Sequence, residues 1–254
     1  MKLKDKVAIV TGSSKGIGEG IARVFSQEGA RLVVVCRTEE AGRKMADELG
    51  AGEGNAIYVK TDVRSSDSIQ AMINTTIETY GKLDVLVNNA GYHISKNVEQ
   101  TSEEEWEFII NTNLRSTFLC SKYAIPHLRK TKGNIINISS MVGQVGQPNA
   151  GAYSSTKGGQ IAMSKGMAID FAPDGIRVNV ICPGWIQTPL VDDWFNQQAD
   201  TEASEKYIFG QHPLGRIGTI EECGKAALFL ACASDSAFIT GITLNIDGGV
   251  TLGY

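Results

Sequence analysis

The sequence lacks the features that mark several large classes of protein. Its longest apolar runs, such as residues 32–36 and 85–87, are strand-sized, far below the roughly 20 residues of a membrane-spanning helix. It has no basic run, and 24 Lys and Arg residues stand against 28 Asp and Glu residues, for a net charge of −4. We therefore expect no membrane insertion and no nucleic-acid partner. Residues 2–6 lack the apolar region of a signal peptide, which predicts a cytoplasmic location.

Cysteine is also scarce. The five cysteines, at positions 36, 120, 182, 223 and 232, are odd in number and form no Cys-x-x-Cys pair. This scatter is typical of free thiols in a reducing compartment, so we expect neither disulfides nor a metal site. Glycine, by contrast, is abundant, with 28 of 254 positions and no collagen-like period. Its expected use is in turns and close backbone approaches.

Short β-branched runs alternate with helical patterns along almost the whole chain. Strands are predicted at residues 6–11, 31–36, 56–60, 84–87, 133–139, 176–182 and 242–246. Helices are predicted at residues 16–28, 39–49, 66–80, 102–129, 152–171 and 220–231. Alternating Val- and Ile-rich strands and helices indicate a parallel sheet covered on both faces. We expect one domain over residues 1–254, an α/β, doubly wound, Rossmann-like fold with a seven-stranded parallel sheet.

Residues 187–218 interrupt this alternation. The segment is polar, carries Trp194 and Phe195, and is too long for an ordinary connection between a strand and a helix. A surface helical hairpin is the plain interpretation. We favour a substrate lid, because the segment begins where the predicted site described below ends.

A glycine-rich turn joins the first predicted strand to the first predicted helix. Gly12, Gly16 and Gly18 are spaced as Gly-x-x-x-Gly-x-Gly where the helix begins. Small residues let the backbone approach a pyrophosphate, and the helix N-terminus directs free N–H groups and a positive dipole end at it. The turn predicts dinucleotide binding. A tight turn without a ligand and the nucleotide loop of a methyltransferase are the alternatives.

Motifs further along make the chain resemble the short-chain dehydrogenase/reductase family. The glycine turn has that family's three-residue first gap. Asn88, Asn89, Ala90 and Gly91 follow the fourth strand, Asn113 lies in the next helix, Ser140 ends the fifth strand, Tyr153 and Lys157 open the following helix, and Pro183 and Gly184 end the sixth strand. The methyltransferase alternative explains none of these later motifs. The resemblance implies interconversion of a secondary alcohol and a ketone with NAD(P).

Tyr153 and Lys157 carry the predicted proton transfer. Four residues apart on a helix, they lie on one face. Free tyrosine has a pKa of about 10, and a nearby ammonium favours the phenolate, so we expect Lys157 to lower the Tyr153 pKa. Tyr153 could then take a proton from an alcohol or give one to a ketone. Ser140, at the end of a strand, is expected to hold the substrate oxygen and stabilise charge on it.

The resemblance adds three roles at this centre. It selects Ser140 rather than the adjacent Ser139 as the catalytic serine. It makes Asn113 the fourth member, which holds a water that links the lysine to solvent in a proton relay; polar packing at a helix kink is the alternative. Lys157 would also bond the nicotinamide ribose, while the cofactor supplies the hydride chemistry.

The end of the second strand predicts the cofactor. NAD-specific relatives usually have an aspartate there, whereas this chain has Cys36 followed by Arg37. Arginine pairs with a 2′-phosphate, and Lys15 adds a second cation, so we predict a preference for NADP. If Arg37 only stacks on adenine, NAD also serves. With Asp62 and Val63 placed beside adenine by the resemblance, the predicted cofactor set is Gly12, Ser14, Lys15, Gly16, Ile17, Gly18, Arg37, Asp62, Val63, Asn89, Ala90, Gly91, Tyr153, Lys157, Pro183, Gly184, Ile186 and Thr188.

A small-molecule substrate is expected, and its pocket is predicted from chain position. The candidates are His93, Ser140, Val142, Gln147, Asn149, Trp185, Leu190 and Trp194. Polar groups beside Trp185 fit a sugar, polyol or cyclitol better than a long acyl chain. The regions of His93 and Gln147, with the chain's last three residues, resemble a branch of the family that oxidises aldose sugars or steroid hydroxyls. A 3-oxoacyl-[acyl-carrier-protein] reductase and a non-catalytic scaffold protein that binds nicotinamide are the alternatives.

Apolar positions on two central helices predict the assembly. Phe118 and Leu119 on one helix, and Met167 and Ile169 on the other, exceed a single apolar stripe. Such helices pack on more than one side, and the resemblance implies a homotetramer built through them and the last strand. The apolar tail, residues 250–254, could cap its own subunit or reach a neighbour's site.

Overall fold

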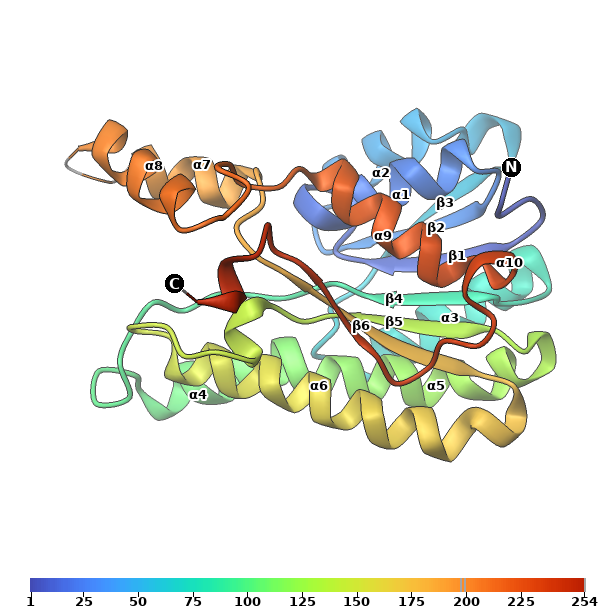
Figure 1. The fold of residues 1–254 in the computed structure, drawn as a ribbon. Helices are drawn as coiled ribbons and strands as arrows, with labels where there is room; N and C mark the ends of the chain where they lie inside the picture. Colours follow the sequence, from blue (N-terminus) through green and yellow to red (C-terminus); the bar gives the residue numbers. More distant parts are fainter. Residues whose placement is uncertain (197, 199, 254) are drawn as a thin grey trace.

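The computed structural model describes residues 1–196, 198 and 200–253, and of Leu190 the backbone alone. Its centre is one parallel sheet in the order β3-β2-β1-β4-β5-β6-β7 (Figure 1). The strands are β1 (Val7–Thr11), β2 (Arg31–Cys36), β3 (Ala56–Lys60), β4 (Val85–Asn88), β5 (Asn134–Ile138), β6 (Arg177–Pro183) and β7 (Thr243–Ile246). The predicted fold class is confirmed, and each predicted strand is right to within one residue at either end.

Helices cover both faces of the sheet because its strands are apolar on both faces. On β1, Val10 belongs to one buried cluster and its neighbour Ile9 to the other, as strand alternation requires. The first cluster packs under α1 (Gly16–Gln27), α2 (Glu39–Glu48) and α9 (Ile220–Ala231); the second packs under α3 (Ser66–Tyr80), α5 (Ser116–Thr131) and α6 (Gly151–Phe171). Figure 1 shows the two helical layers above and below the sheet.

The remaining helical elements are short. They are α4 (Glu103–Ile109), α7 (Pro189–Asn196), α8 (Thr201–Gly210), α10 (Ala233–Ser236), a π-helical turn (Ile110–Arg115) and the 3₁₀ turns Ala51–Glu53, Met141–Gly143, Ala172–Asp174 and Val250–Leu252. Within the described part of the chain, no helix is long and apolar enough to cross a membrane. All five cysteines are free, and no group of three or more His, Cys, Asp or Glu side chains is arranged to hold a metal ion among the residues described.

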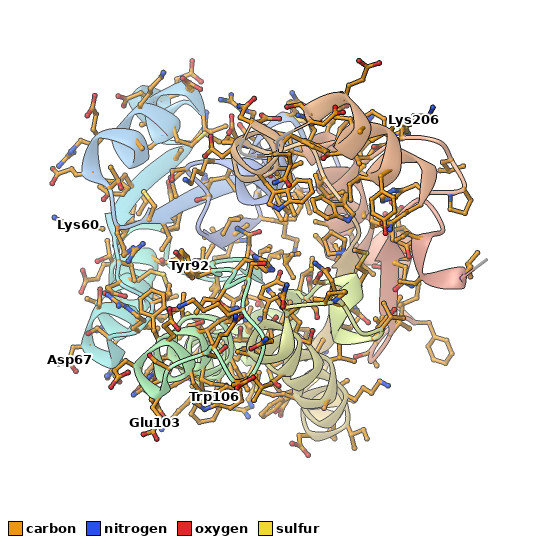
Figure 2. The ribbon with its side chains drawn as sticks, turned by 90° about the vertical axis from the view of Figure 1, so that its left-hand side faces the viewer. Lys60, Asp67, Tyr92, Glu103, Trp106 and Lys206 are labelled. Atoms are coloured by element: carbon orange, nitrogen blue, oxygen red, sulfur yellow. The ribbon has the colours of Figure 1, made fainter. Side chains whose placement is uncertain are left out.

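The order of the strands determines where a ligand can bind. β1 lies between β2 and β4, so the connections diverge on either side of it. In open parallel sheets, ligands bind at the carboxyl ends of the strands beside such a switch point. Figure 2 views the molecule from the side on which α7 and α8 project; Tyr92, which follows β4, lies near the middle of this face, between Lys60 of β3 and Lys206 of α8.

The segment predicted as one helix over residues 102–129 is divided. A capping box of Ser102 and Glu105 starts α4, and the π-helical turn separates α4 from α5. A π turn adds one residue to the helical repeat and is common at functional sites. Asn113 lies in this turn. The predicted helical range was right, but the prediction of one regular helix was wrong. The spacing of apolar residues does not reveal where the backbone hydrogen bonds shift by one residue.

Residues 187–218 contain α7 and α8, which project from one end of the sheet (Figure 1). A bridge between Ile186 and Gly218 closes the base of the segment, with Gln187 N donating to Gly218 O at 2.8 Å. Phe195 and Ile208 form a small core of their own with neighbouring aromatic side chains. The segment is thus a compact helical unit joined to the sheet through a narrow base.

Candidate active site

Two positions of the glycine turn after β1 disfavour a residue with a Cβ, Gly18 for lack of space and Gly16 because of its backbone conformation. A Cβ on Gly18 would lie 2.4 Å from both the Asn89 side chain and the backbone oxygen of Gly12. Gly16 has a φ of +61°, and a Cβ there would lie 3.5 Å from Thr188. The turn therefore brings the backbone close to the segment after β4 and to the segment after β6 at once.

The N-terminus of α1 opens at this turn. Lys15, the N-cap residue, is extended and gives no side-chain cap, so the first-turn N–H groups keep their capacity to bind an anion. Lys15 is exposed, Ser14 is half-buried, and Ile17 packs against the first core cluster. A buried Ser13 hydroxyl accepts a hydrogen bond from Val35 N and holds the turn against β2. These features fit the pyrophosphate of a dinucleotide.

Asn89, Ala90 and Gly91 are held at the carboxyl end of β1. The Thr11 hydroxyl accepts hydrogen bonds from the backbone N of Asn89 and of Ala90, at 2.9 and 3.0 Å. The Asn89 side chain donates to the oxygens of Thr11 and Gly12. A Cβ on Gly91 would approach Lys157 Nζ to 3.6 Å. The segment therefore links the predicted cofactor turn to the predicted catalytic lysine.

Asn113 is fully buried and clamps the loop after β4. Its Oδ1 accepts a hydrogen bond from Tyr92 N at 2.8 Å, and its Nδ2 donates to Tyr92 O at 2.9 Å. The same Nδ2 donates to the Thr156 hydroxyl, which in turn donates to the backbone oxygen of Tyr153. Two roles were predicted for Asn113: holding a relay water, and polar packing at a helix kink. Both are compatible with this geometry, since Asn113 lies at a helix irregularity and contacts the helix of Tyr153.

The two adjacent serines differ in their surroundings. Ser139 is buried, and its hydroxyl donates to the backbone oxygen of Lys157 at 2.8 Å. Ser140 is half-buried and begins the turn Met141–Gly143, where its hydroxyl accepts from Val142 N at 3.4 Å. Ser140 is therefore the more exposed of the two serines, and its catalytic role stays a prediction.

The predicted direction of the Tyr153 pKa is wrong for the protein alone. Burial raises the pKa of Tyr153 to about 12, although hydrogen bonding with Ser140 acts in the opposite direction. Burial also lowers the pKa of Lys157 to about 8. Lys157 Nζ donates to the backbone oxygen of Ile138 at 2.9 Å and lies 5.6 Å from the centre of the Tyr153 ring. Loss of hydration therefore outweighs the attraction between ammonium and phenolate.

His93 packs against Tyr153, the predicted catalytic tyrosine. Its ring centre lies 4.7 Å from that of Tyr153, with the two planes at 80°. Burial lowers the pKa of His93, which favours its neutral form. The predicted pocket residue His93 therefore lies against the predicted acid–base residue Tyr153, and an edge-to-face contact of this kind restricts how the phenol ring can turn.

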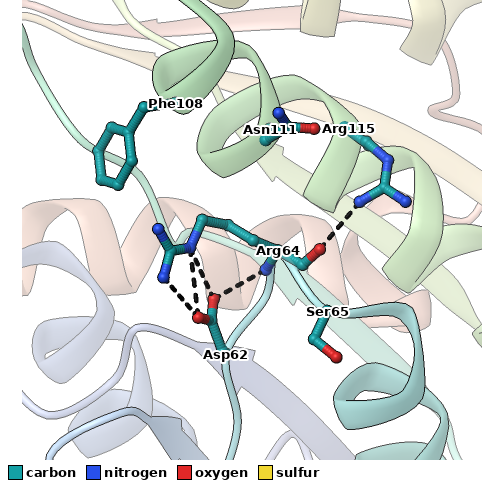
Figure 3. A pocket seen from close by; sticks show the side chains of 6 residues that line it. All are labelled: Asp62, Arg64, Ser65, Phe108, Asn111 and Arg115. Carbon is teal, nitrogen blue, oxygen red and sulfur yellow. Dashed lines mark hydrogen bonds and ion pairs between the residues drawn. The ribbon is translucent and has the colours of Figure 1, made fainter. Parts of the chain in front are cut away.

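The predicted adenine side contains an ion pair that the sequence did not reveal. Arg64 Nη2 lies 2.6 Å from Asp62 Oδ2, and Arg64 Nε lies 3.0 Å from Asp62 Oδ1 (Figure 3). This pairing lowers the pKa of Asp62, to which Arg37 also contributes. Arg64 stacks over Phe108 at 5.1 Å, and Arg115 donates to the backbone oxygen of Arg64. These residues line an open pocket of about 460 Å³. Val63 is buried beside it.

The segment after β6 carries the residues predicted to lie beside the nicotinamide. Pro183 and Ile186 are buried, and a Cβ on Gly184 would lie 2.9 Å from the backbone of Asp247. Thr188 meets the glycine turn at Gly16. The predicted nicotinamide side is therefore closely packed and joined to the base of residues 187–218.

The residues predicted to line the substrate pocket differ in how exposed their side chains are. Val142 is buried, Gln147 is half-buried, and Asn149 is exposed with a φ of +56°. Trp185 and Trp194 pack on each other at 5.1 Å within the small core of residues 187–218. Both tryptophans therefore contribute to the packing of the small core, and their contact with a substrate stays a prediction. The side chain of Leu190, and Tyr254 of the tail, lie outside the described residues.

Several residues around the site were not singled out from the sequence. Arg64 and Thr156 bond predicted site residues directly, and Gln160 bonds the backbone of Asn113. An arginine two residues after Asp62 and a glutamine one helical turn after Lys157 were visible signals. Their partners, however, come from other elements, and only the packing identifies them.

Comparison with known proteins finds one matching family model and several similar proteins. A family model described as enoyl-(acyl carrier protein) reductase matches residues 12–251. L-fucose dehydrogenase of Rattus norvegicus is 42% identical over 250 residues, which cover 98% of this chain and 90% of that protein. Meso-2,3-butanediol dehydrogenase of Serratia marcescens is 36% identical over 251 residues, covering 99% and 96%. A 3-oxoacyl-[acyl-carrier-protein] reductase of Chlamydia muridarum is 39% identical over 250 residues, covering 98% of each.

These matches extend over nearly the whole chain. The chain belongs to the short-chain dehydrogenase/reductase family. It is an NAD(P)-dependent enzyme of the alcohol dehydrogenase and ketoreductase class, acting on a secondary alcohol or the corresponding ketone. The resemblance inferred from the motifs is therefore confirmed.

Proposed function

We propose that the protein oxidises a secondary hydroxyl of a small hydroxylated compound, such as a sugar, polyol or cyclitol, with NADP as the preferred acceptor. The observation that carries the proposal is the convergence of Asn113, Ser140, Tyr153 and Lys157 at the carboxyl ends of the central strands. Two of the relatives, named for L-fucose and for meso-2,3-butanediol, support a small hydroxylated substrate.

In the proposed reaction, Tyr153 takes the hydroxyl proton while Ser140 holds the substrate oxygen. The bound oxidised nicotinamide supplies the hydride acceptor and a positive charge. Lys157 adds a second positive charge near the phenol when it is protonated, and positive charge favours the phenolate. Together these charges act against the burial that raises the Tyr153 pKa to about 12. Asn113 would hold the water through which Lys157 exchanges protons with solvent.

The reaction is tested by turnover and by one variant. A panel of L-fucose, meso-2,3-butanediol, other polyols, a steroid alcohol and a short β-ketoester is run with NAD and NADP, or their reduced forms, while absorbance is followed. Replacement of Tyr153 by Phe removes the acid–base group and should lower kcat about 100-fold or more, with cofactor binding retained. Tyr80→Phe is the matched control, because the buried Tyr80 hydroxyl has no partner among the described residues. Unchanged turnover in Tyr153→Phe would refute the proton transfer.

The preference for NADP follows from Arg37, which is exposed at the end of β2 close enough to lower the Asp62 pKa. An arginine–phosphate pair is worth about 1.5–3 kcal/mol. The variant Arg37→Ala should therefore raise the KM for NADP about 10- to 100-fold and that for NAD less than about threefold. Equal losses for both cofactors would show that Arg37 does not pair with the 2′-phosphate.

A 3-oxoacyl-[acyl-carrier-protein] reductase remains the second candidate, because a relative of that name matches nearly end to end. Faster reduction of the β-ketoester than oxidation of every polyol would favour it. A non-catalytic scaffold, the third alternative, does not agree with the dehydrogenase and reductase relatives, and turnover of any panel member would exclude it. We further propose residues 187–218 as the substrate lid, since Thr188, at the base of this segment, adjoins Gly16 of the glycine turn.

A homotetramer and a cytoplasmic location complete the proposal. The five free thiols suit a reducing compartment.

A further inference from the structure

Gln160 is a buried polar residue that the proposed reaction does not use. It lies on α6, one helical turn after Lys157, and is 1% exposed. Its Nε2 donates to the backbone oxygen of Asn113 at 3.1 Å and to the Thr117 hydroxyl at 2.8 Å. Its Oε1 has no partner among the residues described. Burying an amide with one unpaired atom costs stability, so packing alone does not account for a glutamine here.

The carbonyl that Gln160 contacts belongs to the π-helical turn. The oxygen of Asn113 accepts from the Thr117 hydroxyl at 2.8 Å as well as from the Gln160 amide. Thr117 lies on α5 and Gln160 on α6. Two side chains from different helices therefore hold one backbone carbonyl of the π-helical turn.

The position of Asn113 is passed on to Tyr153 by two routes. Through Thr156, the Asn113 amide is connected to the backbone oxygen of Tyr153. Through two hydrogen bonds to Tyr92, it sets the loop whose next residue, His93, packs edge-to-face on the Tyr153 ring. A shift of the π turn would thus disturb the phenol from its backbone side and from its ring side.

We propose that Gln160 is a positioning residue for the reaction: by anchoring the Asn113 carbonyl it keeps the π turn, and with it Asn113, in register with Tyr153. The proposal rests on the proposed function, because it assigns Gln160 to the proton-transfer step of that same site. It concerns the rate and the pH dependence of turnover rather than substrate or cofactor affinity.

The first test replaces Gln160 by Leu, which has a similar size and no donor. We expect kcat for the best substrate of the panel to fall about tenfold, because the Asn113 carbonyl loses one of its two side-chain hydrogen bonds, with the cofactor KM within twofold of wild type. Because a displaced Asn113 slows proton exit, kcat of the variant should rise with the concentration of a small base such as imidazole, while that of wild type should not. The control is Thr76→Val, which removes a buried hydroxyl on α3 that donates to Met72 O.

The second test uses Gln160→Glu. A protonated carboxyl can donate to the Asn113 oxygen, whereas a carboxylate repels it. Burial raises the pKa of a carboxyl, so the variant should keep much of its kcat at low pH and lose it as pH rises through that pKa. As pH rises, kcat of Gln160→Glu should therefore fall relative to that of wild type. The ratio of kcat of Gln160→Leu to that of wild type should stay constant over the same range.

A third measurement does not need turnover. Amide hydrogen exchange at residues 92–94 and 113–118 should be faster in Gln160→Leu than in wild type, and unchanged in Thr76→Val. If no panel substrate is turned over but this exchange changes as stated, the proposed function fails and the anchoring role stands. If Gln160→Leu keeps wild-type kcat and exchange, or loses activity without any response to added base, the positioning role is overturned.

Discussion

At the scale of single residues, burial determines the pKa shifts of the proposed catalytic pair, Tyr153 and Lys157, more than their mutual charge interaction does. Burial raises the pKa of Tyr153 to about 12 and lowers that of Lys157 to about 8. Both shifts favour the uncharged forms, so the protein alone does not prepare a phenolate. The positive charge of the bound cofactor is therefore part of the proposed chemistry, rather than an addition to a site already charged.

The Lys157 shift also predicts how stability changes with pH. Between about pH 8 and pH 10.4, the unfolded lysine is protonated and the folded one is not. The unfolded state then binds more protons, so this group makes the free energy of unfolding rise with pH, by up to about 3 kcal/mol. Urea titrations at pH 8 and pH 10 measure this change. The free energy of unfolding of wild type should rise relative to that of Lys157→Met as the pH increases. Lys165→Met, exposed on the same helix, is the control, and parallel curves for Lys157→Met would contradict the shift.

At the scale of elements, the turn between β3 and α3 joins the cofactor side of the site to the helices that carry Asn113. The Arg64 guanidinium binds both carboxylate oxygens of Asp62 and stacks on Phe108 of α4. The backbone oxygen of Arg64 accepts a hydrogen bond from Arg115 of the π turn (Figure 3). A carboxylate held by such a fork has a defined orientation. The turn therefore holds the Asp62 carboxylate in one orientation.

Replacing Arg64 by Met should release that carboxylate. If Asp62 contacts adenine as proposed, the KM for the cofactor should rise several-fold while kcat changes less than about twofold, because the reacting atoms are untouched. Hypoxanthine lacks the amino group through which adenine would donate to Asp62. A cofactor with hypoxanthine in place of adenine should therefore have the higher KM in wild type, and the two KM values should be similar in the variant. Arg43→Met, which removes a comparable stacked arginine on α2, is the control. A fall in kcat with an unchanged cofactor KM would contradict this role.

At the scale of the whole molecule, apolar side chains remain exposed on the helices chosen from the sequence. Phe118 of α5 is half-exposed and Ile169 of α6 is 77% exposed. The proposed homotetramer would cover them. Ile169→Asp should therefore reduce the assembly to a smaller species by light scattering, whereas Leu214→Asp, at a residue 70% exposed near the projecting helices, should not. A wild-type monomer would refute the tetramer.

The same variant separates the two uses of the tail. If residues 250–254 reach a neighbour's site, Ile169→Asp should raise the substrate KM, and deletion of residues 253 and 254 should do so with the assembly intact. If the tail caps its own subunit, only the deletion should have an effect. Leu252, exposed at the end of the described tail, leaves both uses open to this test.

The sequence by itself determined the alternating fold, the glycine turn and the pair Tyr153 and Lys157. These depend on local spacing: period-two and helical repeats, a turn that only glycine fits, and two side chains one helical turn apart. Only the tertiary structure decided the direction of the Tyr153 pKa, the grip of Arg64 on Asp62, and the contact of Gln160 with Asn113. Loss of hydration and hydrogen bonding between elements are set by which distant segments meet, and no local pattern records that.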